Sequence, residues 1–150
     1  MLVPLPLFTA QGDLPPGIHR ATLVAVLERF GSGSPQRMLV GLRLERVYNV
    51  AWATGHLARC VVFGSFVTAK PFPNDVDVFL LMEDTFDVAQ LTGEAQLLFE
   101  HPVAQTRFGA SVFWLRRLAV LDDEETTLAH WQITREGYQR GIVEIIPELP

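Results

Sequence analysis

The stretch of sequence that decides the fold reads VFGSFVTAKPFPNDVDV and runs from Val62 to Val78. The apolar run 60–63 ends at Gly64 and is typical of a short buried strand. The run 75–82 alternates in character and predicts a second strand, while prolines and an asparagine between the two runs mark a loop. Because the connection is short, we expect the two strands to be antiparallel neighbours in one sheet.

A phosphate-binding turn is predicted where the first strand ends. Gly64 lets the backbone bend and lets a ligand approach closely. Ser65 adds a hydroxyl and a backbone N–H at the same point. If a helix or turn begins there, these donors form an anion site.

Two carboxylates, Asp75 and Asp77, follow at a spacing that places both on one face of the second strand. Such a pair is self-repelling and costly to desolvate, and a divalent cation resolves both problems. Oxygen ligands favour Mg²⁺ or Mn²⁺. A phosphate turn beside this pair is typical of phosphoryl or nucleotidyl transfer. The alternative is that both carboxylates merely face solvent on an edge strand.

The stretch resembles the nucleotidyltransferases of the DNA polymerase β-like superfamily, and looks closest to small bacterial nucleotidyltransferase-like proteins, some of whose relatives are toxins in toxin–antitoxin pairs. The resemblance implies an α+β fold of the minimal nucleotidyltransferase type, with a small mixed β-sheet flanked by helices. It implies that Asp75 and Asp77 are the catalytic, metal-holding residues, with Mg²⁺ or Mn²⁺ as cofactor. It also implies that Gly64 and Ser65 bind the terminal phosphates of the nucleotide, and that Lys70 neutralises phosphate charge from the loop.

One departure from this resemblance concerns a third carboxylate, which active members usually carry on a later core strand. The candidate strand here, 107–114, contains no acidic residue, and Ser111 stands where one is expected. Two functions therefore stay open. The first is a metal-dependent enzyme that moves a nucleoside monophosphate from an NTP to an acceptor hydroxyl on RNA, a protein or a small molecule. The second is a catalytically weak nucleotide-binding or protein-interaction module.

The rest of the chain predicts one domain, 17–150, preceded by an extended Pro-rich arm, 1–16, that packs on the body through Leu5, Leu7 and Phe8. Helical signal begins near Gly17 and ends at Gly31, and a second helix is expected from Ser34 to Gly55. The expected order then continues with a helix from 84 or 85 to 99, a strand within 106–118, a helix over 122–131 and a last strand over 141–146.

Composition excludes several classes of protein. Apolar residues make up 49% of the chain and charged residues 19%, which predicts a folded chain. The single Cys60 excludes an internal disulfide, and we expect a cytoplasmic protein. The net charge of −5 argues against a dedicated duplex-DNA binder. No apolar run approaches the ~20 residues of a membrane span, so no membrane partner is expected, whereas a second copy or an antitoxin-like partner is expected by analogy.

Overall fold

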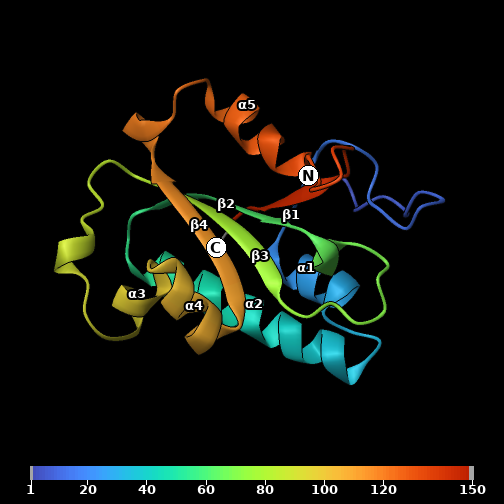
Figure 1. The fold of residues 1–150 in the computed structure, drawn as a ribbon, viewed down its shortest axis with the longest axis horizontal. Coiled ribbons are helices and arrows are strands. Elements are labelled where there is room, and N and C mark those ends of the chain that lie inside the picture. The colour runs from blue at the N-terminus through green and yellow to red at the C-terminus, as the bar shows by residue number, and fades with distance from the viewer. Residues whose placement is uncertain (1, 149–150) are drawn as a thin grey trace.

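The computed structural model of the protein describes residues 2–148, and its centre is a mixed sheet with the strand order β1-β5-β2-β3-β4 (Figure 1). β1 is parallel to β5 and β3 is parallel to β4, while β2 is antiparallel to both of its neighbours. The α+β fold with a small mixed sheet is therefore confirmed. The strands are β1 (Ile18–Ala21), β2 (Leu57–Phe63), β3 (Val76–Met82), β4 (Ala110–Arg116) and β5 (Ile142–Ile145).

Helices lie on both faces of this sheet. Figure 1 shows α5 on one side and the other four on the opposite side, where the larger hydrophobic core lies. A smaller core under α5 includes Phe79, Leu81 and Leu128. No helix within residues 2–148 has the length and apolar character needed to cross a bilayer. The helices are α1 (Leu23–Phe30), α2 (Pro35–Ala53), α3 (Gly93–Leu98), α4 (His101–Phe108) and α5 (Glu124–Ala129).

The helix predicted from Ser34 to Gly55 is confirmed as α2. The Ser34 side chain accepts a hydrogen bond from the Arg37 amide, which satisfies one of the free N–H groups of the first turn. Val40, Leu44 and Val47 recur at helical spacing and are all buried. These apolar residues pack against the sheet. The packing sets the orientation of α2 and thereby the positions of its polar side chains, which include Arg43 and Arg46.

The two strands predicted around the Pro-rich loop are also confirmed. β2 and β3 pair antiparallel, with Phe63 opposite Asp77. The last predicted strand is confirmed as β5, and the helix predicted over 122–131 is present as α5, followed by a short 3-10 helix, His130–Gln132. Asp123 caps α5 by accepting a hydrogen bond from the Thr126 amide.

Two expectations are wrong at the ends of elements. Helical structure does not begin near Gly17, because Ile18–Ala21 forms β1, and Thr22 then caps α1. The segment has a strand conformation because β5 lies beside it, and that partner is remote in the sequence. The strand expected within 106–118 starts later, at Ala110. Residues up to Phe108 belong to α4, and Gly109 ends that helix with φ +63°.

The single helix expected from 84 or 85 to 99 is also wrong. The chain forms a turn, a short 3-10 helix at Val88–Gln90, and then α3. Phe86 and Phe99 lie at the two ends of this segment and both pack against Trp114. The packing of these two rings against Trp114 determines the path of the segment, and a continuous helix does not form.

The N-terminal arm packs on the body, but not through all three expected residues. Leu5 and Phe8 are partly buried against the main core. The Arg29 guanidinium lies over the Phe8 ring and donates hydrogen bonds to backbone carbonyls of the arm. Leu7 is 85% exposed, so its expected contact is wrong, because its side chain faces away from the body.

A buried ion-pair cluster joins the sheet strands on the α5 side. Glu144 of β5 is only 5% exposed, and it accepts hydrogen bonds from Arg20 of β1 and Arg59 of β2 at 2.8–3.0 Å. A buried carboxylate is costly unless it is paired and hydrogen-bonded. The two guanidinium groups donate the hydrogen bonds that the Glu144 carboxylate needs. Arg20 and Arg59 are therefore structural residues.

Candidate functional site: a carboxylate pair at the start of β3

The predicted carboxylates lie where β3 begins. Asp75 directly precedes β3, and Asp77 lies within it, between Phe63 of β2 and Ser111 of β4 in the strand register. Asp77 lies on the α5 side of the sheet with Phe79, whereas Asp75, which precedes the strand, lines a cavity between α2 and α4. The edge-strand alternative does not apply, because β3 has a hydrogen-bonded strand on each side.

Gly64 is required at the turn beside this pair for two reasons. Its φ of +79° is a backbone conformation that residues with a side chain rarely adopt. A Cβ at this position would also overlap the Asp77 carboxylate. The backbone of the predicted phosphate turn therefore lies directly against the predicted metal ligand.

Ser111 contacts the carboxylate pair from the neighbouring strand. It is opposite Asp77 in the register, and its hydroxyl donates a hydrogen bond to Asp75 Oδ2 at 3.3 Å. The Gln105 side-chain amide in turn donates to Ser111 Oγ at 3.1 Å. The side chain on β4 that faces both carboxylates is thus neutral, whereas the resemblance places a third carboxylate on this strand.

The electrostatics of the pair are those of a strained acidic site. Burial, and to a lesser extent the nearby negative charge of Asp75, raise the pKa of Asp77 from 3.8 to about 6. The Ser111 hydroxyl and the positive charges of Arg135 and Arg140 act in the opposite direction. A cation bound between the carboxylates would remove the dominant penalties, which are burial of charge and mutual repulsion.

Two cavities adjoin the pair, and Gln105 lines both. The Asp77 cavity has a volume of about 280 Å³ and includes Gly64, Asp77 and Ser111. Its other walls are aromatic and cationic, from Phe63, His101, Phe113, Trp131, Arg135 and Arg140 among others. The Asp75 cavity has a volume of about 560 Å³ and lies between α2 and α4.

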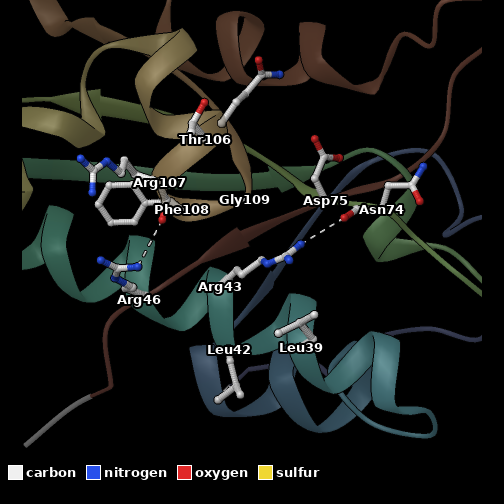
Figure 2. Close-up of a pocket in the computed structure, with 11 residues that line it drawn as sticks. Leu39, Leu42, Arg43, Arg46, Asn74, Asp75, Thr106, Arg107, Phe108 and Gly109 are labelled. Carbon is white, nitrogen blue, oxygen red and sulfur yellow. Dashed lines mark hydrogen bonds between the residues drawn. The ribbon is translucent and has the colours of Figure 1, made fainter.

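Arginines of the Asp75 cavity are site residues that the sequence did not reveal. Arg43 and Arg46 belong to α2; the Arg43 side chain extends toward Asn74 and Asp75, and that of Arg46 extends toward α4, where it donates a hydrogen bond to the Arg107 carbonyl (Figure 2). Arg43 donates a hydrogen bond to the backbone carbonyl of Asn74, the residue before Asp75. Arg107 of α4 lines the same cavity. In the sequence, these residues had only the pattern of a solvated helix face.

Lys70 and Ser65 are not brought into the cleft as predicted. Lys70 is exposed and lines neither of the two cavities. Ser65 opens a short 3-10 helix, Ser65–Val67, and its carbonyl accepts hydrogen bonds from Thr68. Arg37 instead organises this loop, because its guanidinium donates to the carbonyls of residues 66, 68 and 70.

The residues present fit a divalent cation held in one particular way. Within residues 2–148 there is no group of three or more His, Cys, Asp or Glu side chains placed to hold a metal. Asp75 and Asp77 supply two carboxylates, and Mg²⁺ is typically bound by one or two carboxylates together with substrate phosphates. The pair therefore suits an ion that arrives with a phosphorylated ligand, rather than one enclosed by protein.

Fold and site together define an α+β protein whose mixed sheet carries a half-buried carboxylate pair between two cavities. The chain belongs to the family described as Family of unknown function (DUF6932), which matches residues 6–146. Comparison with curated proteins and with solved structures found no match.

Proposed function

We propose that the protein is a metal-dependent nucleotidyltransferase that moves a nucleoside monophosphate from an NTP to an acceptor hydroxyl. The observation that carries the proposal is the contact between the Gly64 backbone and the Asp77 carboxylate, with Asp75 held nearby by the hydroxyl of Ser111, the residue opposite Asp77 on β4. A glycine backbone against an acidic side chain lets a ligand in the adjoining cavity approach both closely.

Three strands support the resemblance to the minimal nucleotidyltransferase fold. The strand before the Gly-Ser turn is antiparallel to the strand with the carboxylates, and β4 adds in parallel after two helices. The residue of β4 opposite Asp77 is Ser111. A residue of β4 next to the carboxylate pair supports the expectation, drawn from the resemblance, that this position corresponds to the third carboxylate.

In this proposal, Asp75 and Asp77 hold Mg²⁺ or Mn²⁺, which supplies charge stabilisation for the phosphates when bound. The acceptor oxygen forms a bond to the α-phosphorus, and the bond to the pyrophosphate oxygen breaks. The hydroxyl proton passes to solvent, because Ser111 is not a base at neutral pH. Products are the acceptor nucleoside monophosphate ester and pyrophosphate.

The two cavities suggest how the substrates are divided between them. The nucleotide phosphates occupy the Asp77 side, next to Gly64, and the acceptor occupies the larger Asp75 cavity. Arg43, Arg46 and Arg107 line that cavity, so an anionic acceptor is favoured among the candidates of RNA, protein and small molecule. A second copy or an antitoxin-like partner could supply the acceptor hydroxyl.

A second candidate function is nucleotide binding with little turnover, which the neutral Ser111 favours. One experiment separates the two: incubation with each α-labelled NTP, Mg²⁺ or Mn²⁺ and a lysate, with Asp77→Asn as the matched control. Label transferred by the wild type and not by Asp77→Asn supports the enzyme. Metal-dependent NTP binding without transfer supports the binding module, and neither binding nor transfer contradicts both.

A further inference from the structure

A small hairpin near the C-terminus brings two further cations to the Asp77 cavity. Residues 132–140 fold back on themselves through the Ile133–Gln139 bridge and a hydrogen bond from the Thr134 amide to the Tyr138 carbonyl. Arg135 lies in the turn and Arg140 at the base, and both line the cavity with Asp77 and Gly64.

The hairpin is anchored rather than loosely attached. The buried Gln132 accepts a hydrogen bond from the Gly17 amide at 2.5 Å and donates one to the Ala129 carbonyl. The Arg140 amide donates to the Gln132 carbonyl, and the chain then enters β5 in the sheet. Arg135 and Arg140 therefore lie at a defined place beside the carboxylates.

Both guanidinium groups retain donors for a ligand. Within residues 2–148, Arg135 makes no ion pair or side-chain hydrogen bond, and the ion pair of Arg140 with Asp13 is long, at 3.8 Å. By contrast, Arg20 and Arg59 are saturated by glutamates. The cavity thus contains cationic side chains whose hydrogen-bonding capacity the protein does not use.

A separate observation also indicates a ligand in this cavity. Thr134 lines the Asp77 cavity, and its hydroxyl is buried and has no hydrogen-bond partner among the described residues. An unpaired buried polar atom is costly and uncommon in folded proteins. A phosphate oxygen in the cavity would accept the hydrogen bond that this hydroxyl has to give.

We propose that Arg135 and Arg140, with the Thr134 hydroxyl, bind the β- and γ-phosphates of the nucleotide, and that Lys70 does not. This inference rests on the proposed function, because it places the phosphates beside Asp77. Guanidinium groups bind phosphate through paired hydrogen bonds and remain charged at all physiological pH values. Neighbouring cations also offset the negative charge that two carboxylates and a triphosphate bring together.

The test is isothermal titration of the full chain with Mg²⁺ and an NTP, with Mg²⁺ and inorganic triphosphate, and with the nucleoside alone. Arg135→Ala is the principal variant, because Arg135 is exposed and its loss leaves the hairpin contacts intact. Arg140→Ala is the second variant, and Glu136→Ala, at the neighbouring turn residue, is the matched control. Lys70→Ala tests the competing assignment.

We expect each arginine variant to weaken NTP binding about tenfold or more, as the loss of one charge-assisted hydrogen bond predicts. Inorganic triphosphate should lose affinity by the same factor, whereas Glu136→Ala and Lys70→Ala should bind as the wild type does. Normal binding by both arginine variants, or a weakening that equals that of Glu136→Ala, overturns the inference. If the wild type binds NTP and Asp77→Asn does not, the proposed function survives that result. If the wild type binds no NTP, both fail.

Discussion

Replacing Asp77 with asparagine should stabilise the protein at neutral pH while removing its metal site. In the folded protein the pKa of Asp77 is raised to about 6, first by burial and then by the charge of Asp75, against 3.8 in an unfolded chain. The folded state therefore binds the proton more tightly than the unfolded state does. Ionising Asp77 in the folded state then carries a free-energy cost that asparagine does not have.

The sign and window of this effect follow from the two pKa values. Below about pH 4 the carboxyl is protonated in both states, and the cost is absent. Stability from this group falls as pH rises through about 4 to 6, and above that the full cost is present. A shift of about two units corresponds to ~3 kcal/mol, or a gain of ~6–12 °C in Tm for Asp77→Asn in a domain of this size.

The assay is thermal or urea unfolding of wild type and Asp77→Asn at about pH 5 and about pH 7.5, with and without Mg²⁺. The stability advantage of the variant should be larger at the higher pH. Mg²⁺ with an NTP should stabilise the wild type alone, because a ligand that binds only the folded state adds stability. Asp122→Asn, an exposed carboxylate near α5, is the control and should show neither effect.

An Asp77→Asn variant that is no more stable than the wild type at the higher pH would refute this reasoning. An advantage of equal size at both pH values would do the same, because it would come from packing and not from ionisation. Equal stabilisation of both proteins by Mg²⁺ and NTP would place the metal elsewhere.

Three further predictions concern neighbouring residues. Ser111→Asp should raise or create transfer of labelled nucleotide under fixed Mg²⁺, since a base contributes ~10²–10⁴-fold, while Ser111→Ala should change little; a slower Ser111→Asp would place the third ligand elsewhere. Gly64→Ala should abolish the Mg²⁺-dependent stabilisation by NTP and lower the unfolding free energy by ~1–3 kcal/mol or more. Gly33→Ala, also at positive φ but with open space around its Cβ, should lower the unfolding free energy only by the cost of the backbone strain. Equal losses in the two variants would contradict the contact between Gly64 and Asp77. Arg37→Ala should destabilise the protein by about 3 kcal/mol in urea unfolding, because four backbone carbonyls lose a hydrogen-bond donor. Arg37→Lys should retain only part of the lost stability. An unchanged urea midpoint would show that the loop does not depend on Arg37.

The carboxylate pair and its two strands could be predicted because their signals are local. Gly64 and Asp77 lie on adjacent strands joined by one short loop, so hydrophobic alternation and spacing already place them together. Ser111, the neutral residue that β4 presents to the pair, was predicted only through the family resemblance, because β4 is separated from β3 by two helices. A prediction based on local spacing stays correct even when the predicted ends of the strands are wrong by a few residues.

The cationic part of the site could not be predicted, because its residues come from remote segments. Arg43 belongs to a helix before β2, and Arg135 to a hairpin after α5, and neither lies in a recognisable motif of the sequence. Polar residues in such a setting are typical of a solvated surface. β1 was missed for a related reason, since its strand conformation depends on β5 and not on its own four residues.

The position of β5 has a consequence for how this protein is made. β5 lies between β1 and β2, and its Glu144 pairs with Arg20, 124 residues earlier in the chain. During synthesis from the N-terminus, β2, β3 and β4 can assemble while β1 still has no neighbour. The sheet closes only after the last strand leaves the ribosome, so a nascent chain stalled before β5 presents an open β2 edge to other chains.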